Sequence, residues 1–221
     1  MNGMPGTVVD GTGSPGTGPA GRREDHAMTP LTREKLYGLE EYARIRSEFR
    51  AQVMAHKRTR KLHVGPNATL YFEDALTVQY QVQEMLRIER IFEPAEIQGE
   101  LDAYTPLVPD GSNWKATFML EFPDAEERRE ALARLRGVED RVYVRVEGFD
   151  PVFATADEDL ERENDTKTSA VHFLRFELTP EMAKAVKAGA SVGAGIDHPS
   201  YAFAVPAVSR EQRDSLAADL A

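Results

Sequence analysis

One glutamate falls on a helix face that is otherwise apolar, and it is the side chain best placed to do chemistry. When residues 77–92 are projected onto a helix, one stripe collects the apolar side chains Val78, Val82, Met85 and Phe92. Gln81 and Glu89 fall inside this stripe, where a carboxylate needs a partner or a proton. If burial raises its pKa, Glu89 could act as a general base, and Glu84 is the alternative on the same helix.

A row of basic side chains follows one edge of an earlier helix. Over residues 39–58, the predicted buried face consists of Leu39, Tyr42, Ile45, Phe49, Val53 and His56. Along the edge of that face lie Arg46, Arg50 and Lys57. From residue 44 to residue 61 the chain has seven cations and a single acidic residue, Glu48. Because the whole chain carries a net charge of −10, this basic segment predicts an anionic partner.

Two interpretations of these groups are open. Glu89 or Glu84 could pair with Arg46 or Arg50 as a structural ion pair where the two helices cross. Alternatively, the basic edge could line a pocket for a small anionic or amide-bearing ligand, since arginine offers a planar fork to such groups. The ligand-binding residues would then be Arg46, Arg50, Lys57, Gln81 and Arg87. In an enzymatic version, Arg87 or Arg50 orients the substrate beside the glutamate base.

His172 is the histidine most relevant to function. It shares one face of a predicted strand with Leu174, Phe176 and Leu178, so its ring should point into the core. A buried histidine is usually a hydrogen-bonded core residue. With Glu89 or His56 it could instead bind iron, manganese or zinc, which accept mixed imidazole and carboxylate ligands. No metal-binding spacing and no nucleophile motif is present, and we therefore expect no cofactor.

The apolar spacing predicts an α+β fold with a mainly antiparallel sheet packed against several helices. Helical periodicity covers residues 33–58, 77–92, 95–104, 124–135, 180–188 and 209–220. Strands are predicted at 61–64, 69–73, 115–122, 141–147, 171–178, 190–196 and 201–205. Several strands follow one another without an intervening helix, which favours antiparallel pairing.

Amino-acid composition indicates the extent of the domain, the kinds of chemistry that are excluded and the expected compartment. Residues 1–27 are rich in Gly and Pro and should form a disordered tail, which leaves residues 28–221 as one α+β domain. The chain has no cysteine, which excludes thiolate nucleophiles, cysteine-held clusters and disulfides. The acidic balance disfavours nucleic-acid binding. No apolar run is long enough to span a membrane and no secretion signal is apparent, so we expect a cytoplasmic protein.

Four stretches of the chain are similar to a known family. They read RIRSEFRAQVMAHKRTRKLHVGP, TVQYQVQEMLRIERI, ELDAYTPLVPDG and AVHFLRFEL. Together they resemble the bacterial domain of unknown function 3501 family from about Leu31 to Leu220. The residues that match the family pattern include Arg46, Arg50, Lys57, Arg60, Gln81, Gln83, Glu84, Arg87, Glu89, Tyr104 and His172.

The resemblance implies a biological context and no particular reaction. Genes of the family often lie near those of a rubrerythrin-like protein and of an iron–sulfur protein of the heterodisulfide-reductase type. We therefore expect an accessory or binding protein of a redox or oxidative-stress pathway that acts with these protein partners and holds a small anion. The alternatives are a small-molecule enzyme with a buried glutamate base and an arginine anchor, or a metal-dependent oxidase-type protein with Glu89 and His172 as ligands.

Overall fold

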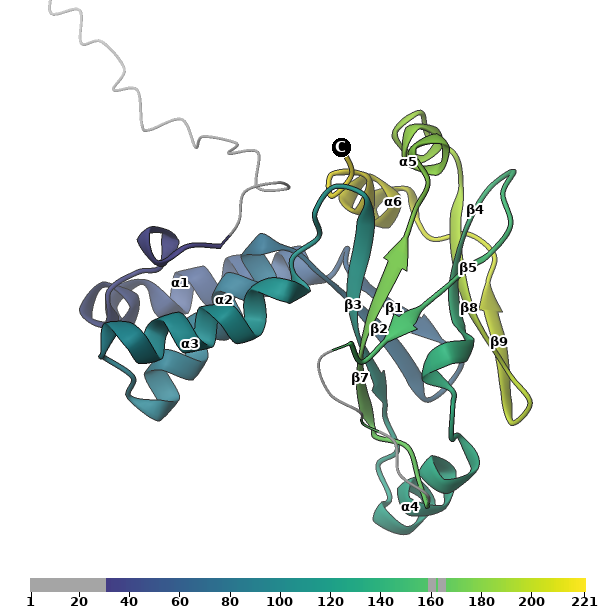
Figure 1. The fold of residues 1–221 in the computed structure, drawn as a ribbon, viewed down its shortest axis with the longest axis horizontal. Helices are drawn as coiled ribbons and strands as arrows, with labels where there is room; N and C mark the ends of the chain where they lie inside the picture. The colour runs from purple at the N-terminus through teal and green to yellow at the C-terminus, as the bar shows by residue number, and fades with distance from the viewer. Residues whose placement is uncertain (1–30, 159–161, 163–165) are drawn as a thin grey trace, which may run out of the picture.

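Two antiparallel sheets and six α-helices make up the part of the chain that the structure describes (Figure 1). The computed structural model describes residues 31–158, 162 and 166–221. The α+β class and the antiparallel pairing predicted from the sequence are therefore confirmed. The predicted tail, residues 1–27, lies outside the described residues.

The larger sheet has the strand order β1-β2-β3-β7-β6, and the smaller has the order β5-β4-β8-β9. The strands are β1 (Lys61–Val64), β2 (Ala68–Glu73), β3 (Asn113–Leu120), β4 (Val142–Val146), β5 (Val152–Phe153), β6 (Thr155–Ala156), β7 (Val171–Glu177), β8 (Val192–His198) and β9 (Tyr201–Val205). The helices are α1 (Leu39–Lys57), α2 (Ala75–Glu89), α3 (Pro94–Tyr104), α4 (Ala125–Arg134), α5 (Pro180–Lys187) and α6 (Arg210–Ala217). The described residues also form three short 3-10 helices: η1 (Arg33–Lys35), η2 (Thr105–Leu107) and η3 (Glu139–Arg141).

The main core lies between the two sheets. On β3 and β7 the residues alternate, so that Trp114, Phe118 and Phe176 point into this core while their neighbours point to the opposite face. Burial of these aromatic side chains supplies much of the driving force for folding. The indole nitrogen of Trp114 is satisfied by a hydrogen bond of 2.9 Å to the main-chain carbonyl of Leu216. The end of α6 is thereby fixed to the larger sheet.

Helices α1, α2 and α3 form a helical arm that extends to one side of the two sheets (Figure 1). Helix α2 lies between the other two and packs on both of them. Its start is set by Asp74, whose side chain accepts a hydrogen bond from the Thr77 main chain in a capping box. No helix in the described residues is long and apolar enough to cross a membrane.

Candidate functional site

A cavity of about 450 Å³ lies between the end of the helical arm and the outer face of the larger sheet. We call it the Lys115 cavity. The end of α3 and η2 contribute the wall residues Ala103, Tyr104, Pro106 and Leu107. The sheet and the segment after β6 contribute Lys115, Glu158, Phe173, Leu174 and Arg175. The lining thus combines an apolar surface with three charged groups, which is typical of sites for small organic ligands.

The strand alternation explains why charged groups line this cavity. Lys115 follows the buried Trp114 on β3, and Arg175 precedes the buried Phe176 on β7, so both face away from the core. The register pairs Lys115 directly with Arg175 across the two antiparallel strands. Like charges placed opposite each other destabilise a sheet. A negatively charged group between them would relieve this repulsion.

Arg175 already has acidic partners, whereas Lys115 does not. Both oxygens of Glu158 accept hydrogen bonds from the Arg175 guanidinium, at 2.8 and 3.0 Å, and Glu177 accepts a third at 2.6 Å. Among the described residues, no carboxylate lies within ion-pair distance of the Lys115 amine. Burial and the positive charge of Arg175 lower the pKa of Lys115. The amine of Lys115 is therefore half-buried, unpaired and next to a cavity.

The predicted ion pair between α1 and α2 forms at Glu84. Its carboxylate accepts hydrogen bonds from Arg46 Nε (2.7 Å), Arg46 Nη2 (2.8 Å) and Tyr42 Oη (2.6 Å). Hydrogen bonding from Arg46, against the opposing effect of burial, lowers the pKa of Glu84 to about 2. The expectation that burial would raise this pKa is wrong. A carboxylate that holds its proton so weakly is a poor general base, so Glu84 acts here as half of a structural ion pair.

The predicted buried face of α2 is confirmed at Val78 and Val82 but is wrong at its polar positions. Glu89 and Gln81 are exposed, and Glu89 forms no ion pair with any described residue. Gln83, assigned by the projection to the outer face, is fully buried and bonds to the main chain of Tyr37 through both ends of its amide. Because α2 packs against α1 on one side and α3 on the other, its buried face is centred near Val82 and Leu86 and not near Met85.

The other basic residues of the predicted ligand site lie outside the Lys115 cavity. Arg50 and Arg87 are exposed, and Lys57 is half-buried at the end of α1. Arg87 makes one bond of 3.3 Å to Glu84, one turn earlier in its own helix. Five of the better-formed cavities of the described residues are lined by other side chains and not by Arg46, Arg50, Lys57, Gln81 or Arg87. The small-anion site on α1 and α2 stays a prediction.

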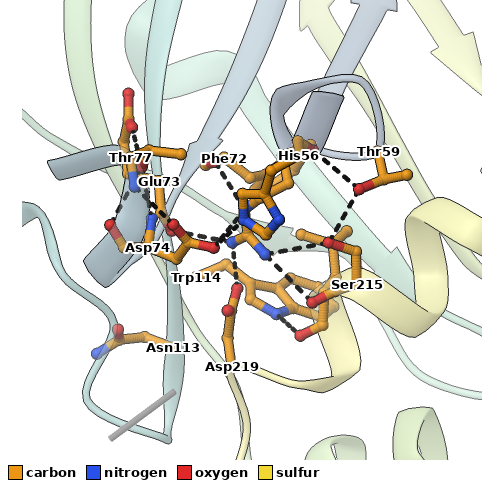
Figure 2. A network of polar contacts seen from close by, with 12 residues as sticks. His56, Thr59, Phe72, Glu73, Asp74, Thr77, Asn113, Trp114, Ser215 and Asp219 are labelled. Atoms are coloured by element: carbon orange, nitrogen blue, oxygen red, sulfur yellow. Dashed lines mark hydrogen bonds and ion pairs between the residues drawn. The ribbon is translucent and has the colours of Figure 1, made fainter. Parts of the chain in front are cut away.

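A buried ion network joins the helical arm to the C-terminal residues of the chain (Figure 2). The sequence did not reveal this network. Arg60 is only 2% exposed and donates to the main-chain carbonyls of Phe72, Glu73 and Ser215. It also pairs with Asp219 at 2.5 Å and with Asp74 at 3.4 Å, and His56 lies 2.5 Å from the same Asp74 oxygen.

The two acids of the network differ in proton affinity. Against the effect of burial, His56 and Arg60 lower the pKa of Asp74 to about 2. At Asp219 burial prevails over the charge of Arg60 and raises the pKa to about 6. None of its side chains lines any of the same five cavities. We therefore interpret it as structural, and it accounts for part of the excess of cations between residues 44 and 61.

His172 lies fully buried, as predicted from its strand face. Its ring contacts Asp157 and lies near Glu139. The predicted partners, Glu89 and His56, are elsewhere: Glu89 is exposed on α2 and His56 pairs with Asp74. Asp157 and Glu139 lie in short connecting segments without helical or strand periodicity, and no local sequence signal indicates that they would meet His172.

Comparisons with known proteins identify a family but no activity. A solved protein of unknown function from Burkholderia pseudomallei is 52% identical to this chain, with a TM-score of 0.83. The similarity covers 87% of this chain and 100% of that one. No curated protein matches the sequence significantly. The model of a family described as "Protein of unknown function (DUF3501)" matches residues 30–220. This match covers most of the chain, which therefore belongs to the DUF3501 family.

Proposed function

We propose that this protein binds a small organic anion, with an apolar body, in the Lys115 cavity. The observation that carries the proposal is the unpaired, half-buried amine of Lys115 beside Arg175 in a cavity with an apolar lining. A carboxylate or sulfonate near Lys115 would supply the anionic partner that Glu158 and Glu177 already provide for Arg175. Phe173, Leu107 and Pro106 offer apolar contact to the rest of the ligand.

The redox context is part of the same proposal. Its support is membership of the DUF3501 family, together with the expectation from the resemblance that genes of the family lie near those of rubrerythrin-like and iron–sulfur proteins. We propose that the protein acts with such partners in the cytoplasm as an accessory protein and is not itself the electron carrier. Two exposed apolar side chains at and just after the end of α2, Ile88 (61% exposed) and Phe92 (64% exposed), are the surface we assign to a protein partner.

Binding of the fluorescent anion 8-anilinonaphthalene-1-sulfonate tests the ligand proposal. Its aromatic body and sulfonate match the chemistry of the cavity, and its fluorescence rises in apolar surroundings. Lys115→Met keeps the apolar stem and removes the charge, and it should weaken binding about 10-fold or more, as expected for the loss of a charge-assisted hydrogen bond. Binding should also weaken at high pH as Lys115 loses its proton.

Lys61→Met is the matched control. Lys61 lies on β1 of the same sheet, over the ring of Tyr71 and outside the cavity. Its replacement should leave the dissociation constant unchanged within about 2-fold. Equal affinities for the two variants would remove the basis of the proposal. For the partner surface, Phe92→Asp should abolish co-purification with the rubrerythrin-like or iron–sulfur protein, and capture of neither by the wild-type chain would count against the redox role.

A further inference from the structure

A second group of polar side chains, remote in sequence from the helical arm, surrounds the ring of His172. Glu139 comes from η3, Thr168 and Ser169 come just before β7, and Asp157 follows β6. His172 and Thr168 are almost completely buried, and the carboxyl groups of Glu139 and Asp157 are each 9% exposed. Both carboxylates are therefore held beside an imidazole with little access to water.

Both ring nitrogens of His172 face oxygen atoms. Nδ1 lies 2.6 Å from Asp157 Oδ2, so it donates its hydrogen to that carboxylate. Nε2 lies 3.1 Å from the Ser169 carbonyl oxygen and 3.0 Å from Thr168 Oγ1. Thr168 Oγ1 also lies 3.1 Å from Glu139 Oε2, and its single hydroxyl hydrogen can serve only one of these two contacts. With Nδ1 protonated, a neutral imidazole would turn its Nε2 lone pair toward the Ser169 carbonyl oxygen, which can only accept. A proton or a metal ion at Nε2 would make this contact favourable.

The distances around Nε2 are those of neighbouring ligands on one metal ion. With metal–ligand bonds of about 2.1 Å, adjacent ligand atoms lie about 3.0–3.4 Å apart. The distances from Nε2 to the Ser169 and Thr168 oxygens fall in this range. Glu139 Oε2 lies 3.7 Å from Nε2, so its side chain would have to move only a few tenths of an ångström closer. A proton on Nε2 would be directed at one of these oxygens, whereas an ion at their centre would bind all of them.

Asp157 occupies the position that supports a metal-bound histidine. In metal sites the second ring nitrogen usually donates to a carboxylate, which fixes the ring and raises the basicity of the ligating nitrogen. The other oxygen of Asp157 accepts a hydrogen bond from the Phe173 main chain and lies 3.4 Å from Arg162. Asp157 is therefore held on the Nδ1 side by contacts of its own.

We propose that His172 Nε2 and the carboxylate of Glu139, with the oxygens of Thr168 and Ser169, bind one divalent transition-metal ion of the manganese, iron or zinc class. One imidazole with oxygen ligands suits these ions. Asp157 is the supporting outer residue. The network around Arg60 offers a contrast, because there the guanidinium already provides the positive charge between Asp74 and Asp219.

Metal uptake by the full chain tests this assignment. The protein is stripped with a chelator, incubated separately with Mn²⁺, Zn²⁺ and Co²⁺ salts, passed through a desalting column and analysed by elemental mass spectrometry. We expect about one ion per chain for at least one of the three. His172→Gln and Glu139→Gln should reduce uptake at least 10-fold. Asp157→Asn should weaken affinity about 10- to 100-fold. His56→Gln, a histidine paired with a different carboxylate, should retain full uptake.

Crystals of the wild-type chain soaked in the metal salt provide a measurement that does not depend on the folding of a variant. An anomalous peak should lie about 2.1 Å from His172 Nε2. Uptake below a tenth of an ion for all three metals, or a peak elsewhere, would overturn the assignment and leave a doubly protonated His172 as the positive species. Equal uptake by the wild type and a folded His172→Gln variant would overturn it as well.

Discussion

Replacing Arg60 by methionine should destabilise the chain more than any surface substitution. Its guanidinium donates to three main-chain carbonyls and pairs with Asp219 and Asp74. The side chain of Asp219 is 4% exposed, so the loss of Arg60 leaves a buried carboxylate with no cation at bonding distance. Met retains most of the apolar volume, so the variant mainly removes the charge and the donors.

The magnitude follows from the burial of both partners. Removing one member of a buried pair costs about 3–5 kcal/mol, because the remaining charge stays desolvated. For a chain of this size such a loss lowers the melting temperature by about 10 °C. The double variant with Asp219→Asn removes the orphaned charge and should recover part of the loss. The deficit that remains, about 2–3 kcal/mol, reflects the three carbonyls without donors.

Urea unfolding at pH 7.5 measures these values. At this pH Asp219 is ionised in the folded wild-type chain, since its pKa is about 6. The single variant should lose about 3–5 kcal/mol of unfolding free energy with an unchanged dependence on urea. A loss below about 1 kcal/mol, or a double variant less stable than the single one, would refute the interpretation of this network as a buried structural pair.

Three further predictions concern stability. As the pH rises from 4 to 6, the unfolding free energy should fall by up to about 3 kcal/mol. Burial raises the pKa of Asp219 to about 6, so the folded chain favours the neutral form that is lost over this range. Below pH 4 the unfolding free energy should fall as acidity increases, since the pKa of Asp74 is lowered to about 2. Urea midpoints across this range should show a flatter profile from pH 4 to 6 for Asp219→Asn, and an unchanged decline would contradict the assignment. Glu84→Gln should cost about 1–2 kcal/mol and Glu89→Gln less than about 0.5 kcal/mol by the same assay, and the reverse order would contradict the observed orientation of α2. Gly193→Ala should cost about 1–3 kcal/mol in thermal unfolding, because a Cβ there would lie 2.6 Å from the Pro206 carbonyl oxygen. Gly99→Ala, in α3 with open space around it, should instead stabilise the chain by about 0.5–1 kcal/mol. Equal effects of the two substitutions would show that backbone crowding at Gly193 is unimportant.

Elements with a single buried face could be predicted closely from the sequence. The bounds predicted for β1 and β9 agree with the structure to the residue, and α1 buries Tyr42, Phe49 and Val53 as its spacing indicates. The short strands β5 and β6 were missed, since two residues each are too few to show a period.

The interpretation of α2 failed for a physical reason. A hydrophobic projection assumes one apolar neighbour, whereas α2 is packed between α1 and α3. Gln83 is buried because its amide replaces a main-chain partner for Tyr37, a role that a hydrophobicity pattern cannot show. Long-range pairing also determines the sites. Strand alternation places Lys115 on the outer face of β3, but only the tertiary structure shows that α3 and η2 cover it.

The most direct test of the central proposal is a crystal structure of the wild-type chain soaked with naphthalene-1-sulfonate. We expect electron density for the ligand in the Lys115 cavity, with a sulfonate oxygen about 2.7–2.9 Å from the Lys115 amine and the rings against Phe173 and Leu107. Density at another surface, or an unoccupied Lys115 cavity at a saturating concentration of the anion, would contradict the account.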